Sequence, residues 1–73
     1  MVTSEEVLAA FCNAGVAAED VSSIQYRGSN HSWCVSFTSR VLKDFILEKG
    51  VVTFGNVSVF VGNTDFKTVI VKV

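Results

Sequence analysis

The stretch Trp33-Cys34-Val35-Ser36-Phe37 alternates large apolar residues with small ones. A period of two is typical of a β-strand that buries one face in a core and leaves the other face open. We therefore expect the tryptophan, the valine and the phenylalanine of this stretch to point inward. The opposite face would be lined by Ser32, Cys34 and Ser36. If this strand lies at the centre of a sheet, that open face is where a binding function would be found.

The composition indicates one globular domain spanning residues 1–73. Apolar residues make up 49% of the chain and proline is absent, which favours a packed core over a disordered segment. The formal net charge is −1, so the chain as a whole has no electrostatic attraction for nucleic acid or for an anionic membrane.

Three features of the sequence bear on location. No apolar run approaches the roughly 18 residues that a membrane span requires. The residues after Met1 lead into a capped helix rather than into the apolar segment of a signal peptide. Two cysteines, Cys12 and Cys34, do not make a disulfide framework, so a reducing compartment is the simpler interpretation. We expect an intracellular protein, cytoplasmic or nuclear, that does not contact a membrane.

Two amphipathic helices are expected. Thr3-Ser4-Glu5-Glu6 has the form of a capping box, which predicts a helix over about residues 4–14 that stops at Gly15. A second helix follows a cap at Thr38 or Ser39 and ends at Gly50. The apolar stripes of the two helices are Val7, Leu8, Phe11 and Cys12 in the first and Val41, Leu42, Phe45 and Ile46 in the second. The charged residues expected to stay in solvent on the second helix are Arg40, Lys43, Asp44, Glu48 and Lys49.

Five strands are expected between and after these helices. Turn-forming residues at Gly28-Ser29-Asn30 join the first two strands in a hairpin, and Gly55-Asn56 is a two-residue hairpin signal. The strands cover residues 21–27, 32–37, 51–54, 57–61 and 67–73.

The order of these elements predicts an α+β fold of the ferredoxin-like type, with two helices on one face of an antiparallel sheet. That fold ordinarily begins with a strand before its first helix, and here Met1-Val2 is too short to be one. Strand 67–73 can take the empty central place, between 57–61 and 32–37, which makes the arrangement circularly permuted. The alternative is that 67–73 is an added edge strand or the start of a following domain.

The end of the central stretch, Val35-Ser36-Phe37, fits the last part of a ribonucleoprotein motif, which is valine, any residue, aromatic. With the element order, it resembles an RNA-recognition-motif (RRM) domain. The two outward aromatics of the motif fall on Ser32 and Cys34, its leading basic residue falls on Asn30, and Ile70 stands where the partner motif has an aromatic. The resemblance implies an RRM-like fold without the usual aromatic platform for RNA.

A second resemblance covers nearly the whole chain. Gly15, Ser23-Ile24-Gln25, the stretch 33–37 and the strand 67–73 are similar to the region that precedes the knuckles in CCHC-type zinc-finger proteins. This group includes the zinc-finger CCHC-domain protein 3 type and retroelement-derived gag-like proteins of fish. In it this region is RRM-like, and nucleic acid is bound largely by basic segments and by the zinc knuckles. The resemblance implies a module of a nucleic-acid-binding, retroelement-related protein.

Few residues carry recognisable chemistry. His31 has no cysteine or carboxylate partner nearby in sequence, and Cys12 and Cys34 lack the spacing of metal ligands. The glycines sit in turns and not in a phosphate-binding loop. We therefore expect no enzymatic activity, no catalytic residues, no metal, no cofactor and no small-molecule substrate.

The candidate binding residues are three cations and one aromatic. Arg27, Lys67 and Lys72 are the basic residues that can border the open face of the sheet. Phe60 is out of phase with its strand, because the valines at positions 57, 59 and 61 take the opposite side. Phe60 either packs under a loop or the chain end, or it offers a stacking surface or a contact for a partner protein.

Two hypotheses follow. The first is a non-enzymatic RRM-like module that contacts RNA or single-stranded DNA weakly through Arg27, Lys67, Lys72 and Phe60. The alternative is a protein-interaction or self-association module, which the near-neutral charge and an exposed edge strand such as 21–27 favour.

Overall fold

The computed structural model describes residues 2–28 and 31–72. It has two helices and five antiparallel strands, so the predicted α+β class is confirmed. The predicted turn residues Ser29 and Asn30, the end residue Val73 of the last strand and Met1 lie outside the described residues. The elements are α1 (Ser4–Asn13), a 3₁₀ turn (Ala18–Asp20), β1 (Val21–Arg27), β2 (Ser32–Phe37), α2 (Arg40–Lys49), β3 (Val51–Phe54), β4 (Val57–Asn63) and β5 (Thr68–Lys72).

Both helices begin and end where the local sequence predicts. The Thr3 hydroxyl accepts a hydrogen bond from the Glu6 N–H at 3.3 Å, and the Ser39 hydroxyl accepts one from the Val41 N–H at 3.2 Å. These caps satisfy amide groups that have no partner inside the helix. Gly50 ends α2 with a φ of 79°, a left-handed conformation that favours glycine.

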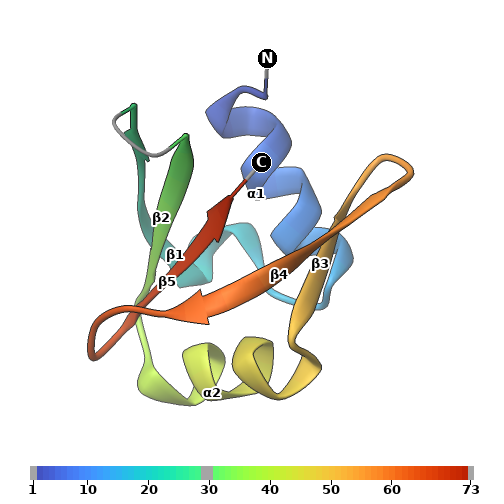
Figure 1. Ribbon diagram of the computed structural model, residues 1–73. Coiled ribbons are helices and arrows are strands. Elements are labelled where there is room, and N and C mark those ends of the chain that lie inside the picture. Colours follow the sequence, from blue (N-terminus) through green and yellow to red (C-terminus); the bar gives the residue numbers. More distant parts are fainter. Residues whose placement is uncertain (1, 29–30, 73) are drawn as a thin grey trace.

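The sheet has the strand order β1-β2-β5-β4-β3, and every neighbouring pair is antiparallel. β5 therefore lies between β2 and β4, the position predicted for the last strand, and it is not an added edge strand (Figure 1). Val69 and Val71 on β5 are fully buried. The two-residue turn Gly55-Asn56 joins β3 to β4, as its sequence predicts.

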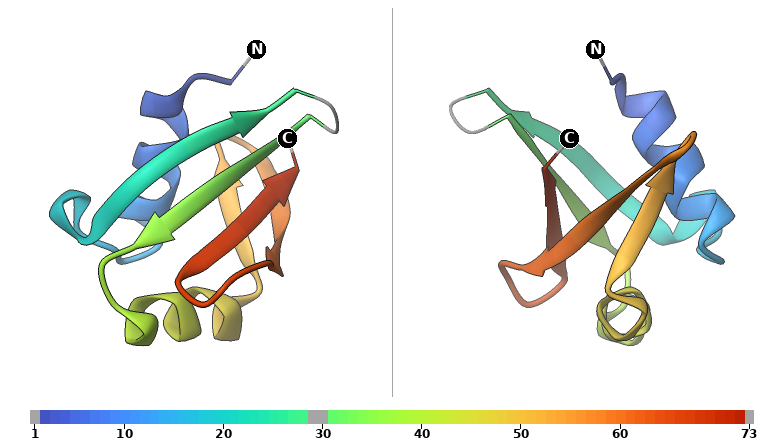
Figure 2. Two further views of the ribbon diagram at one scale, coloured as in Figure 1. Left: turned by 90° about the vertical axis from the view of Figure 1, so that its left-hand side faces the viewer. Right: turned by 45° about the vertical axis from the view of Figure 1, so that its right-hand side comes forward.

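The sheet is strongly curved and wraps around α1, while α2 lies across one end of the strands (Figures 1 and 2). α1 contacts the two outermost strands, β1 and β3, so it closes the open side of the curve. Both helices contribute to one core on the inner face of the sheet. Its fully buried members are Val7 and Phe11 (α1), Val16 (the loop before β1), Val35 and Phe37 (β2), Ile46 (α2), Val52 (β3), and Val69 and Val71 (β5).

The predicted helix faces were wrong at several positions. Cys12, expected in the core, is exposed, and Ala10 is buried in its place. The reason is that α1 packs against β3 as well as β1, which turns the Ala10 side of the helix inward. On α2, Val41 and Phe45 are exposed although both belong to the predicted apolar stripe. Because α2 crosses only one end of the sheet, a narrow part of its surface is covered, and Ile46 is the residue that reaches the core.

Lys43 was expected in solvent, but it is buried. Its Nζ donates a hydrogen bond to the backbone carbonyl of Asp65, in the turn between β4 and β5. The aliphatic part of a lysine can lie on apolar surface while its ammonium group reaches a polar partner. This hydrogen bond of Lys43 therefore connects α2 to the turn that precedes β5, the central strand.

The hydrogen bonds of β5 predict its amide exchange. The Phe37 N–H donates to the Lys67 carbonyl at 2.9 Å, and strand residues alternate in direction, so the Val69 and Val71 amides point to β2. By the same alternation the Tyr26 amide points away from β2, at the edge of the sheet. In a hydrogen-exchange experiment, Val69 and Val71 should be among the slowest amides and Tyr26 should exchange much faster. Fast exchange at both valines would contradict the central position of β5.

The burial of Lys43 predicts an effect of its substitution on stability. Lys43→Ala should lower the free energy of unfolding by about 1–3 kcal/mol, because it removes a buried stem and leaves the Asp65 carbonyl without this donor. Lys49→Ala, on the exposed side of the same helix, should change it by less than about 1 kcal/mol. Urea unfolding of the two variants measures the difference, and equal stabilities would contradict a structural role for Lys43.

Candidate functional site

The two faces of β2 follow the predicted alternation. Val35 and Phe37 belong to the core, and Trp33 packs against it, so the other face, which we call the outer face, carries Ser32, Cys34 and Ser36. This face is less open than expected, because Ser32 is fully buried and Cys34 is 5% exposed.

The side chain of Arg27 covers part of the outer face of β2. The residue is on β1, and its Nε donates to the Cys34 Sγ at 3.2 Å, so the guanidinium lies over the outer side of β2. Further along the same face, the hydroxyls of Ser36 and Thr68 form a hydrogen bond of 2.9 Å. The centre of the outer face is therefore occupied by short polar contacts and presents no ring to a ligand.

Two of the candidate cations flank one position of β2. Arg27 on β1 and Lys72 on β5 are both opposite Ser32 in the strand register, one on each side. Both cations are exposed. The structure therefore brings these two residues into one row across three strands.

Lys67 is separated from that row. It precedes β5, whereas Lys72 is the last described residue of the strand. Five residues of extended chain place them roughly 16 Å apart. Lys67 also has the opposite phase from Lys72, so it does not share the outer face with the other two cations.

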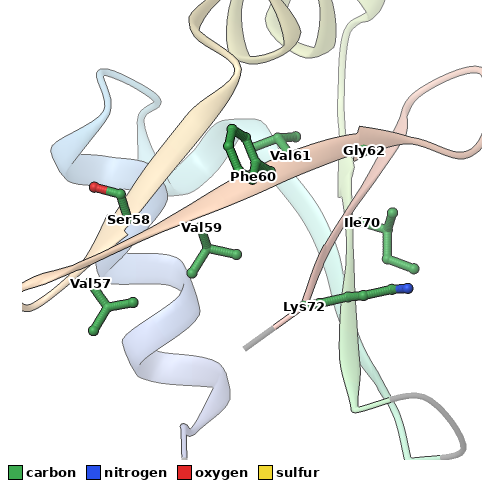
Figure 3. Close-up of a pocket in the computed structure, with 8 residues that line it drawn as sticks. All are labelled: Val57, Ser58, Val59, Phe60, Val61, Gly62, Ile70 and Lys72. Atoms are coloured by element: carbon green, nitrogen blue, oxygen red, sulfur yellow. The ribbon is translucent and has the colours of Figure 1, made fainter.

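Phe60 is the aromatic residue that the sequence analysis singled out, and it is 83% exposed. It does not pack under a loop or under the chain end. Figure 3 shows its ring on the opposite side of β4 from Val57 and Val59, as the phase of the strand predicts. Phe60 therefore projects from the outer face into solvent.

An open groove lies beside Phe60, between β4 and β5. It has a volume of about 520 Å³, and its lining is mainly apolar. Lys72 is the charged residue among those that line it (Figure 3). The lining residues are Val57, Ser58, Val59, Phe60, Val61, Gly62, Ile70 and Lys72.

Sequence reasoning missed how Gly62 and Ile70 shape this groove. The two residues are opposite each other in the register of β4 and β5. A Cβ atom on Gly62 would lie 2.9 Å from Cγ2 of Ile70, which is closer than non-bonded carbon atoms normally approach. Ile70 therefore occupies the space above a glycine, and only the paired strands reveal this because the two residues are in different elements.

The structure also places His31, the histidine that the sequence analysis considered. His31 is exposed, and its Nδ1 lies 3.3 Å from the Tyr26 hydroxyl. No group of three or more His, Cys, Asp or Glu side chains is placed to hold a metal ion among residues 2–28 and 31–72. The same residues include no helix that could cross a lipid bilayer.

Comparisons with known proteins assign no relative to the chain: no family model, no curated protein and no solved structure matches it. A functional interpretation therefore depends on the geometry of the outer face and of the groove beside it.

The contact between Gly62 and Ile70 predicts the effect of a small substitution. Gly62→Ala should lower the free energy of unfolding by about 1–3 kcal/mol, since the new methyl group forces Ile70 or the backbone to move. Gly28→Ala is the matched control, because the nearest atom to its added Cβ is 3.5 Å away, at ordinary contact distance. Thermal unfolding compares the two, and a Gly62→Ala variant as stable as Gly28→Ala would contradict the close packing.

Proposed function

We propose that this chain is a non-enzymatic, RRM-like module of a nucleic-acid-binding, retroelement-related protein that acts inside the cell. In this proposal it contacts single-stranded RNA or DNA weakly through the outer face. The observation that carries the proposal is the position of Phe60, which is 83% exposed and lines the same groove as Lys72. An aromatic ring that stacks a base, beside a cation that attracts a phosphate, is the basic unit of single-strand binding.

The strand order supports the RRM-like part of the proposal. In a ferredoxin-like arrangement that has been circularly permuted, the last strand fills the central place that the first strand usually holds. The observed position of β5 between β2 and β4 agrees with that arrangement. Both helices contribute to the core on the inner face, and Phe60 on the outer face remains exposed.

The same residues limit the expected affinity. The central strands offer no aromatic platform, because Ser32 and Cys34 occupy the outward positions and are buried. Two exposed cations, Arg27 and Lys72, border the face, and the net charge of the chain is −1. One aromatic and two cations favour weak, sequence-tolerant contact.

The second candidate function is a protein-interaction or self-association module. The groove between β4 and β5 favours it, because its lining is mainly apolar and includes one charged residue, Lys72. Val57 at the end of the groove is 60% exposed. Contiguous apolar surface of this kind is a frequent feature of interaction sites.

A titration of fluorescent single-stranded RNA and DNA at low salt tests the first function. The protein should bind both with a Kd of about 100 µM or somewhat below. Phe60→Ala should weaken binding by about 1–3 kcal/mol through the loss of stacking. Lys72→Glu should also weaken binding. With two phosphate contacts, the logarithm of the binding constant should fall against the logarithm of the salt concentration with a slope of roughly −1.4.

Lys67→Glu is the matched control for Lys72→Glu, because it makes the same change of charge at the other end of β5. It should weaken binding less, since Lys67 lies away from Phe60. Equal effects of the two variants would mean that binding follows net charge and not a site. Absence of binding at about 100 µM protein would contradict direct contact with nucleic acid.

A further inference from the structure

The hydrogen bond between Arg27 and Cys34 runs diagonally across two strands. In the register of β1 and β2, Arg27 is opposite Ser32. Cys34 lies two residues further along β2, where Gln25 is its partner on β1. The Arg27 side chain therefore extends along the outer face of β2 to bring its Nε within 3.2 Å of the Cys34 Sγ.

This hydrogen bond restricts the guanidinium group of Arg27. The Nε–H lies in the plane of the group, so donation to a fixed acceptor sets the direction of the planar fork. Cys34 is a fixed acceptor, because it is buried and its strand is paired on both sides. The bond uses Nε and leaves the two Nη groups, which can bind two oxygens of one phosphate.

Neither Arg27 nor Lys72 is paired with a carboxylate among the residues that the structure describes. The ion pair in that part of the chain joins Arg40 to Asp44 on α2, and both of its side chains are exposed. The two cations of the outer face are also exposed. Binding of an anion by Arg27 and Lys72 therefore breaks no ion pair within the described chain.

The positions of Arg27, Ser32 and Lys72 form a row at the ends of three strands. Arg27 ends β1, Ser32 begins β2 and Lys72 ends β5. The Cα atoms of the two cations are two strand spacings apart, or about 10 Å. Extending the register of β4 and β5 by one step past its last pair places Phe60 opposite Lys72. Two cations and an aromatic ring thus follow one another across the strands.

We propose that Cys34 is a positioning residue for nucleic-acid binding. It holds the Arg27 guanidinium so that Arg27 and Lys72 contact neighbouring phosphates of one single strand, which runs across the β-strands and stacks a base on Phe60. The inference rests on the proposed nucleic-acid function, to which it adds the direction of the bound strand and a role for a buried thiol. Without the sulfur, the long Arg27 side chain samples more rotamers, and binding has to immobilise it.

Variants of Cys34 with and without an acceptor test the inference. Cys34→Ala removes the acceptor and should raise the Kd for a fluorescent single-stranded RNA by about two- to tenfold, the effect of one long side chain that binding must order. Cys34→Ser restores an acceptor and should bind like the wild type. Cys34→Val also lacks the acceptor but fills the site, and it replaces Cys34→Ala if the smaller residue prevents folding.

The salt dependence separates positioning from charge. Cys34→Ala keeps both cations, so the slope of the logarithm of the binding constant against the logarithm of the salt concentration should equal that of the wild type. Lys72→Gln loses one phosphate contact and should make this slope shallower by roughly 0.7. In NMR spectra of the free protein, the Arg27 Nε–H signal should shift in Cys34→Ala and return toward its wild-type position in Cys34→Ser.

Two controls exclude a general disturbance of the outer face. Ser36→Ala removes the hydroxyl that is bonded to Thr68, on the same face of β2, and should leave the Kd unchanged. In an Arg27→Ala background, Cys34→Ala should have no further effect on the Kd, because its influence passes through Arg27. Thermal unfolding confirms that each variant is folded at the temperature of the titration.

The outcomes distinguish this inference from the function on which it rests. A wild-type chain that binds RNA while Cys34→Ala binds it equally well overturns the positioning role and leaves the proposed function. The same holds if Ser36→Ala weakens binding as much as Cys34→Ala, or if Cys34→Ala still weakens binding in the Arg27→Ala background. A wild-type chain that binds neither RNA nor DNA overturns the function and the inference together.

Discussion

The structure depends on the antiparallel pairing of β5 with two strands. One is β2, which comes much earlier in the chain, and the other is β4, which comes just before β5. β5 joins the hairpin β1–β2 to the hairpin β3–β4, and among the described residues no other strand pairing links the two hairpins. Val69 and Val71 add two fully buried side chains to the core to which both helices contribute. A single five-residue strand therefore connects the sheet and completes the core.

The central position of β5 also decides which part of the outer face is accessible to solvent. Across β1, β2 and β5 this face is closed by contacts within the sheet, including Arg27 over Cys34 and the hydroxyl pair of Ser36 and Thr68. The accessible apolar surface lies instead where β4 separates from β5, and Phe60 is its most exposed large residue. The proposed contacts therefore lie at the margin of the sheet and not at its centre.

Much of the local structure could be predicted from short patterns. The caps Thr3 and Ser39, the stop at Gly50 and the turn Gly55-Asn56 each depend on hydrogen bonds or backbone angles within a few residues, so a sequence window contains the necessary information. The alternation in β2 and the reversed phase of Phe60 are local for the same reason. The exposure of Cys12 and the burial of Lys43 were missed, because each depends on a distant element: β3 for the first and the turn at Asp65 for the second.

By itself the sequence determined the class of fold and the phase of the strands, and it proposed four residues for the outer face, Arg27, Lys67, Lys72 and Phe60. Only the tertiary structure decided which of these lie together. Arg27 and Lys72 share a row because the registers of β1 and β5 on β2 coincide at Ser32, and Lys67 lies away from it. The groove beside Phe60 exists because β4 pairs with β3 over one half of its length and with β5 over the other. Periodicity sets the side to which a residue points, whereas the neighbouring strands decide whether that side is covered.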